Sequence, residues 1–178
     1  MAVFTKRSRL TLPATALALL GSALALSGLV QSPAHAQGAS EYRNTISNNM
    51  RACAPGGGPA VRVTVTGIRS AEGMIRVQSY RGTRDDWLEK GRWLNRIEAP
   101  ARAGRMVFCM PLPAEGTYGI AVRHDANGNG KTDISQDGGA MSNNPSINIF
   151  NLGKPSYKKT AFSVGREVKQ ITIEMKYM

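Results

Sequence analysis

Residues 61–66 read Val-Arg-Val-Thr-Val-Thr, with an apolar side chain at every second position. A period of two is the pattern of a β-strand that buries one side and exposes the other. Residues 105–112 are apolar at both parities, which predicts a strand covered on both faces. The alternation, strong or weak, recurs at residues 75–78, 95–99, 118–123, 160–164 and 171–177.

One segment favours a helix. In residues 83–93, Thr83 is a candidate N-cap, Asp85 and Asp86 stand in the first turn, and Gly91 keeps the helix short. With about seven predicted strands and no regular alternation with helices, the sequence predicts an all-β fold. We expect an antiparallel β-sandwich with one short helix and one long loop.

The long loop covers residues 125–157 and is rich in Asn, Gly, Ser and Asp. It exceeds the usual length of a connection in a compact domain, so a functional role is one expectation for it. We predict an ordered excursion packed on the sandwich, because the loop contains four apolar anchors, Ile147, Ile149, Phe150 and Leu152.

The N-terminal residues have the pattern of a secretory signal peptide. Three cationic residues come first, Lys6, Arg7 and Arg9. A small-residue and apolar stretch at residues 10–30 follows, and Ala34-His35-Ala36 offers a cleavage site before Gln37. The alternative is a retained membrane anchor, although glycine and serine dilute the apolar stretch. We expect residues 1–36 to be removed and the protein to be periplasmic or extracellular, with no transmembrane segment after processing.

Residues 37–59 are predicted to be a flexible lead-in, and residues 60–178 a single domain. The chain has two cysteines, Cys53 and Cys109. In an oxidising compartment a disulfide between them is the economical expectation, and two free thiols are the alternative. The bond would tie the Gly/Pro-rich segment 54–59 to a strand in the middle of the domain.

The candidate site is a calcium loop that begins at Asp125. Calcium takes six to eight oxygen ligands, and a D-x-N-x-N-G run supplies several of them from one turn. The predicted ligands are Asp125, Asn127, Asn129, the Lys131 carbonyl and Asp133. Gln136 stands where a bidentate Glu is usual, so the expected affinity is weak, with Kd about 10⁻⁴–10⁻³ M, and Asp137 would complete the shell if the chain folds back.

The alternative is that the two Asn-Gly pairs are ordinary turns in which Asp125 and Asp133 cap backbone amides. Enzyme classes fit less well. His124 is the only histidine after the leader, and no nucleophile elbow, phosphate loop or dinucleotide fingerprint is present. We therefore expect the protein not to be an enzyme.

The formal net charge of the chain is +11, and the three cations of the leader contribute only +3 of it. Several of the remaining cations stand at the polar parity of strands, namely Arg62, Arg76, Arg123 and Lys176. If they share a face, that face would attract an anionic envelope polymer, a glycan or lipid head groups. A solvated basic surface is the alternative, and nucleic acid is not expected because no groove-reading motif is present.

Several segments together resemble a bacterial secreted family known as domain of unknown function 2141. They are VRVTVTGI at 61–68, GMIRVQSY at 73–80, LP at 112–113, GTY at 116–118, AVRHD at 121–125, NGNG at 127–130 with Asp133, SNN at 142–144, and KPSY at 154–157. The resemblance implies a transthyretin-like or prealbumin-like sandwich at the bacterial envelope, without an established activity. We therefore expect a non-catalytic binding or structural module with a calcium-ordered loop, and the alternative is a basic adhesin-like domain.

Overall fold

The structure, a computed structural model, describes residues 40–133, 135–147 and 153–178. The predicted leader, residues 1–36, lies outside the described residues. None of the described helices is long and apolar enough to cross a membrane.

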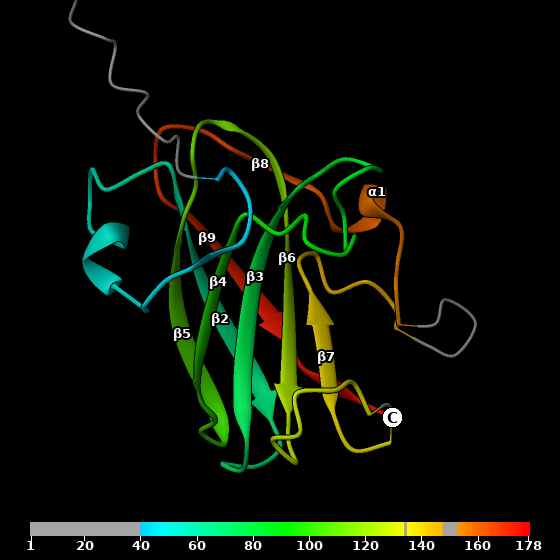
Figure 1. The fold of residues 1–178 in the computed structure, drawn as a ribbon. Helices are drawn as coiled ribbons and strands as arrows, with labels where there is room; N and C mark the ends of the chain where they lie inside the picture. Colours follow the sequence, from blue (N-terminus) through cyan, green and yellow to red (C-terminus); the bar gives the residue numbers. More distant parts are fainter. Residues whose placement is uncertain (1–39, 134, 148–152) are drawn as a thin grey trace, which may run out of the picture. The chain divides into compact units, whose positions relative to one another are not determined.

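The described residues from Ser40 onward form two facing β-sheets (Figure 1). The larger sheet has the order β1-β4-β3-β6-β7-β10, with β8 added beside β6. Its strands are β1 (Asn44–Thr45), β3 (Met74–Arg81), β4 (Asn95–Pro100), β6 (Gly116–Asp125), β7 (Gly138–Met141), β8 (Phe162–Val164) and β10 (Lys176–Tyr177). The smaller sheet has the order β5-β2-β9, formed by β2 (Ala60–Ile68), β5 (Gly104–Pro111) and β9 (Lys169–Glu174). The predicted all-β sandwich is confirmed.

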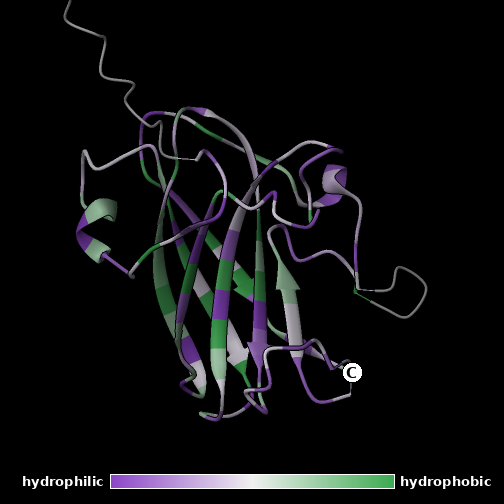
Figure 2. Ribbon diagram, in the orientation of Figure 1, coloured by the Kyte–Doolittle hydropathy of each residue, from purple (hydrophilic) through white to green (hydrophobic). Residues whose placement is uncertain are grey.

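The core lies between the sheets and follows the alternation in the sequence. Val63 of β2, Val77 of β3 and Ile120 of β6 are fully buried and belong to one apolar cluster. Figure 2 shows the corresponding change between hydrophilic and hydrophobic bands along the strands. Burial of each such side chain contributes about 1.5–3 kcal/mol relative to its exposure, which is why the period of two was informative.

Both sheets are mixed, whereas antiparallel pairing was expected. β9 runs parallel to β2, with Val63 opposite Ile171, and β1 runs parallel to β4. Parallel neighbours need a long crossover connection. The chain supplies one, because the strands of the larger sheet from β3 to β8 come between β2 and β9.

The prediction of a helix at residues 83–93 is wrong. The backbone amide of Trp87 donates to the Thr83 carbonyl, so a single turn forms, but Leu88 then adopts a positive φ of 58°. The indole Nε1 of Trp87 instead donates to the carbonyl of Pro155 at 2.9 Å. One turn does not offset the cost of helix nucleation, and tertiary contacts decide the conformation here. Among the described residues, the short α-helix is α1 (Tyr157–Thr160).

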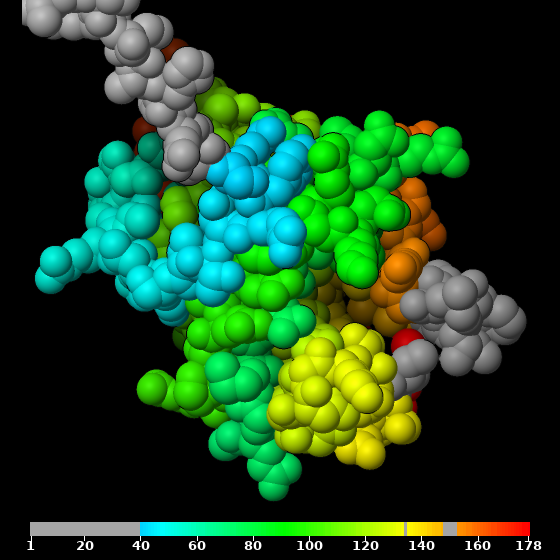
Figure 3. Space-filling model, in the orientation of Figure 1, coloured from blue at the N-terminus to red at the C-terminus, as the bar shows by residue number. Residues whose placement is uncertain are grey.

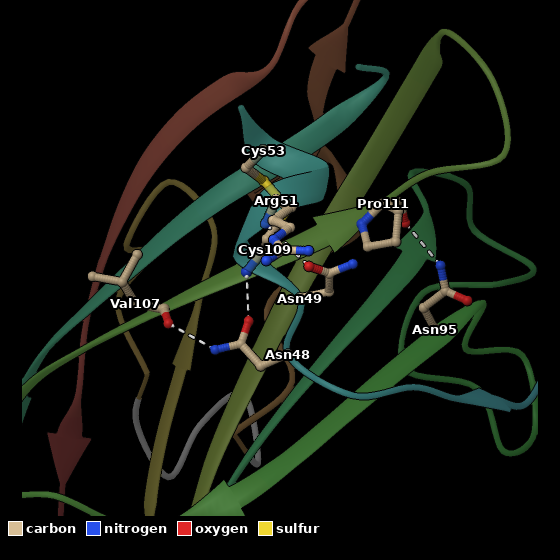
Figure 4. Close-up of a disulfide and its surroundings, with 8 residues drawn as sticks. All are labelled: Asn48, Asn49, Arg51, Cys53, Asn95, Val107, Cys109 and Pro111. Carbon is tan, nitrogen blue, oxygen red and sulfur yellow. Dashed lines mark hydrogen bonds between the residues drawn. A yellow bond between two sulfur atoms is a disulfide. The ribbon is translucent and has the colours of Figure 1, made fainter. Parts of the chain in front are cut away.

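The predicted disulfide between Cys53 and Cys109 is present (Figure 4). It joins the 3₁₀ turn Met50–Cys53 to β5, an edge strand of the smaller sheet. Asn48 also binds this segment to β5. Its Oδ1 accepts from the Cys109 amide, and its Nδ2 donates to the Val107 carbonyl, both at 3.0 Å. Edge strands expose unpaired backbone groups, and Asn48 pairs with two of those on β5. The described part of the predicted flexible lead-in is therefore attached to the sandwich.

The long segment at residues 125–157 contains β7, which pairs with β6, and so divides into two shorter connections. Of its four expected anchors, Ile147 packs against an apolar cluster on the outside of the larger sheet. Ile149, Phe150 and Leu152 lie outside the described residues.

Candidate functional site

The connection between β6 and β7 is the candidate loop, which we call the Asx loop (residues 125–137; Figure 1). It starts at Asp125, whose side chain is buried at the end of β6. Its Oδ2 accepts from the Gly130 amide at 2.9 Å and from Nη2 of Arg123 at 3.1 Å. Its Oδ1 is also buried and has no hydrogen-bond partner in the described part of the chain. A buried carboxylate oxygen without a partner is costly, so it marks a place where a cation would be stabilised.

Asn127 and Asn129 shape the loop in the same way. The Oδ1 atom of Asn127 accepts from the Asn129 amide at 3.1 Å, and that of Asn129 accepts from the Lys131 amide at 2.7 Å. Each bond spans two residues, and side chains of this type stabilise tight turns by such local bonds. Gly128 and Gly130 have φ values of 68° and 76°, which glycine adopts without strain.

Asp133 closes the loop from the other side. Its Oδ2 accepts from the Nδ2 atoms of Asn127 and Asn129, at 2.8 and 2.6 Å. These two hydrogen bonds, from Asn127 and then Asn129, lower the pKa of the Asp133 carboxyl below its usual value of 3.8. The carboxylate is thus held ionised beside the two amides. For both amides to present oxygen to a metal ion at this point, they would have to rotate.

The structure therefore brings together Asp125, Asn127, Asn129 and Asp133. Lys131 enters the network through its backbone amide, and Gln136 through its Oε1, which accepts from Asn127 at 3.2 Å. Within the described ranges, no three or more His, Cys, Asp or Glu side chains cluster in a way that could hold a metal ion. The oxygen set of a bound cation would thus depend on asparagine and carbonyl oxygens as well as the two carboxylates.

The structural roles of two residues, Asp137 in the loop and Arg123 at the end of β6, were not recognised from the sequence. Asp137 was a candidate sixth ligand, but its two oxygens accept from the amides of Ala126 and Asp133, at 3.1 and 3.0 Å. Arg123 donates from Nη1 to Oγ1 of Thr132 and from Nη2 to the Gly130 carbonyl, at 3.0 and 3.2 Å. Its place two residues before Asp125, at the same strand parity, was the available signal.

His124 is fully buried beside the loop and is engaged on both ring nitrogens. Nε2 lies 2.7 Å from the Glu72 carbonyl, which only accepts, so Nε2 carries a proton. Nδ1 lies 2.7 Å from the hydroxyl of Tyr177, which already accepts from the Arg69 amide at 3.0 Å. In the neutral tautomer, Tyr177 donates to Nδ1 and every group is satisfied. His124 thus joins β6 to two other segments.

The predicted cations divide between the sheets. Arg76 on β3 lies directly opposite Arg123 on β6, and Gly139 on β7 lies between Arg123 and Lys176 on β10. Directly paired residues project from the same side of a sheet, so three of the four cations share one side of the larger sheet. Arg62 lies on β2, in the other sheet.

Arg96 on β4 is a fourth cation on this side that sequence reasoning missed. It is paired with Gln78 in the register, and its guanidinium carbon lies 4.1 Å from the centre of the Trp93 ring. Burial, followed by the nearby charge of Arg76, lowers the pKa of Arg96. Its Nε is buried, and in the described ranges this nitrogen has no hydrogen-bond partner.

The fold and the Asx loop define a β-sandwich domain with one disulfide and one polar, glycine-containing loop. The family described as "Uncharacterized protein conserved in bacteria (DUF2141)" matches residues 63–172. The chain belongs to this family, as the resemblance in its motifs implied. No curated protein and no solved structure matches the chain.

Proposed function

We propose that this protein is an exported, non-catalytic binding module whose Asx loop is ordered by a calcium ion. The disulfide and the bacterial family are consistent with export, because disulfides form and persist in oxidising compartments. The observation that carries the metal proposal is the buried Oδ1 of Asp125, which has no partner in the described residues.

The way in which Asp125 is held supports this assignment. Oδ2 is fixed by the Gly130 amide and by Arg123, so the carboxylate cannot turn its second oxygen to water without losing both bonds. A calcium ion on Oδ1 would satisfy that oxygen and leave the existing bonds intact. Oxygen donors from Asn127, Asn129 and Asp133 lie on the same short loop, as a hard cation requires.

Calcium would also change the bonds within the loop in a defined way. Asn127 and Asn129 now direct their Nδ2 atoms to Asp133. On calcium binding we expect the carboxylate of Asp133 to exchange these two amide hydrogens for the cation. The side-chain NH₂ signals of the two asparagines should therefore shift in an NMR spectrum, whereas those of Asn48, which holds β5, should not.

The test is a thermal melt of the oxidised protein in chelator and in calcium, together with calorimetric titration. A Kd of about 10⁻⁴–10⁻³ M is expected. Calcium at about 20 times Kd adds about 1.8 kcal/mol of stability and raises Tm by roughly 4–7 °C.

Asp125→Asn and Asp133→Asn should lose the calcium shift, while Asp85→Asn, an exposed acid on another loop, should keep it. Magnesium serves as a second control, because its octahedral shell is less tolerant of a flexible oxygen set. Equal melts in chelator and calcium, with no heat of binding, would return the loop to ordinary turn chemistry.

A further inference from the structure

The outer side of the larger sheet carries a basic groove, which we define by two adjoining hollows. One, of about 760 Å³, is lined by Arg76, Arg96, Tyr80 and Trp93, with Arg43 and Lys90 at its border. The other, of about 480 Å³, includes Arg123, Gly139, Lys154 and Lys176. Both are lined by Gln78, Leu88 and Thr132, so they are continuous across the sheet. In Figure 3 the loop at residues 83–93 and the yellow Asx loop stand on either side of a recess.

The charge in this groove is poorly compensated. Among the described lining residues there are seven cationic side chains and two acidic side chains, Glu89 and Asp137. Asp137 is occupied by backbone amides. Three of the cations have acidic partners outside the lining: Arg76 pairs with Glu98 at 2.6 Å, Arg123 with Asp125 at 3.1 Å and Lys176 with Glu174 at 3.0 Å. Arg96 makes no ion pair with a described carboxylate, although it lies next to Arg76. The groove therefore keeps an excess of positive charge, which attracts an anion.

The shape of the groove favours an extended ligand over a small anion. From β4 to β10 the groove crosses five neighbouring strands, which is about 19 Å at the usual strand spacing. The cations are spread along this length, with Arg96 and Arg76 at one end and Lys154 and Lys176 at the other. Repeated negative charges along one chain match this spacing.

The composition of the groove favours a polysaccharide over a membrane surface. Stable binding to a lipid surface draws on apolar side chains that insert between head groups as well as on charge. In the part of the chain that the structure describes, Met178 is the one exposed large hydrophobic residue. Met178 borders the groove, and the other large apolar side chains that line it, such as Leu88 and Ile147, are partly buried rather than projecting. The arginine, amide and hydroxyl groups beside them suit carboxylates and sugar hydroxyls.

We propose that the basic groove binds an acidic polysaccharide, with the carboxylates of its uronic acid units paired to Arg76, Arg96 and Lys176. This inference deepens the proposed function and rests on its binding role, but it does not require calcium. Thr132 of the Asx loop lines the groove and accepts from Arg123, so the loop forms one wall of the site.

Gly139 offers a sharp test because it lies in the row between Arg123 and Lys176. A Cβ at this position meets nothing within 4 Å, so a larger side chain can enter the groove without displacing the sandwich. Gly139→Glu would place a carboxylate where the ligand's own charge belongs. Gly139→Gln has nearly the same size and is the matched control.

The probe is a galacturonate hexamer, titrated by calorimetry into the oxidised protein at low salt, with maltohexaose as the neutral counterpart. We expect the hexamer to bind and maltohexaose not to bind. Gly139→Glu should weaken binding at least about tenfold more than Gly139→Gln. The pair Arg76→Gln/Arg96→Gln should cause a loss of similar size, whereas Arg62→Gln/Arg105→Gln removes the same charge from the other sheet and should change Kd less than about twofold.

Equal losses in the two arginine pairs would mean attraction to the overall charge and would overturn the site. Binding of maltohexaose with equal affinity, or binding to phosphatidylglycerol vesicles but not to the hexamer, would also overturn it. Should Arg96→Gln fail to fold, amide shifts of the unaltered protein decide the matter. Shifts confined to β3, β4, β6, β7, β10 and the adjoining loops that line the groove support it, and shifts elsewhere or none contradict it. The titrations are run in chelator and in calcium. If calcium still raises Tm but the hexamer does not bind, the groove is rejected and the calcium site is not.

Discussion

The hydroxyl of Tyr177 lies 2.7 Å from Nδ1 of His124, and their rings meet edge to face with centroids 5.8 Å apart. Tyr177 is on β10 and His124 is on β6, two strands away in the larger sheet. The Tyr177 ring passes over Gly138 of β7, where a Cβ would come within 2.5 Å of it. This contact joins the C-terminal strand to the strand that starts the Asx loop.

Tyr177→Phe should therefore destabilise the protein by about 1–3 kcal/mol. The change removes the hydrogen-bond partner of Nδ1 of the buried His124 and that of the exposed Arg69 amide, while the ring still packs. Urea unfolding measures the loss. Tyr157→Phe is the control, because the Tyr157 hydroxyl has no hydrogen bond to the described residues, and equal stability of the two variants would contradict the role of this network.

Gly73→Ala should cost at least about 3 kcal/mol. Gly73 has a φ of 68°, and an added Cβ would overlap the carbonyl oxygen of Asp125. Gly104→Ala separates the two causes, since Gly104 has a φ of 84° but open space around it, and we expect a cost of only about 1–2 kcal/mol. Similar values for both variants would show that the backbone beside Asp125 can move freely.

Asp133 should titrate below 3.8 because the amides of Asn127 and Asn129 hold its charged form. Its folded pKa is lowered, so its contribution to stability is present above the ordinary pKa and disappears as the pH falls through the folded pKa. Carboxyl carbon shifts followed by NMR from pH 6 downward measure this. In Asn127→Ala/Asn129→Ala the Asp133 pKa should return toward 3.8, and an unchanged pKa would rule out the amides as the cause.

Reduction of the disulfide should cost about 4 kcal/mol, because the bond closes a loop with a sequence separation of 56. Cys53→Ser/Cys109→Ser should unfold at a correspondingly lower urea concentration. The amides of Val107 and Cys109 should exchange faster in this variant, since the segment that covers β5 loses its covalent anchor. Unchanged exchange would show that Asn48 alone holds the segment.

The sequence was informative wherever one side of a strand faces the core, as at Val61, Val63 and Val65. It did not reveal β7, because Gly138 and Gly139 carry no side chains from which to read an alternation. Residues 83–93 looked helical from local signals, but the contact between Trp87 and Pro155 links positions far apart in the chain. Parallel pairing of β2 with β9 is a long-range property that no local pattern contains.

In the candidate site, too, the sequence indicated the local contacts but not the long-range ones. Asn127, Asn129 and Asp133 interact within six residues, so their spacing alone indicated their association. Asp137 looked like a further ligand because its type fits, but its distances to two backbone amides depend on how β7 returns. Arg96 was missed because its neighbour Arg76 lies on another strand.

The position of β9 and β10 in the chain has a consequence for the order of events in folding. β9 forms an edge of the smaller sheet beside β2, and β10 forms an edge of the larger sheet only one residue later. Neither layer is complete until residues 169–177 arrive, more than a hundred positions after β2 begins. A polypeptide emerging from a ribosome would thus lack the strands that finish both layers for most of its synthesis, so neither sheet can close before residues 169–177 have been made.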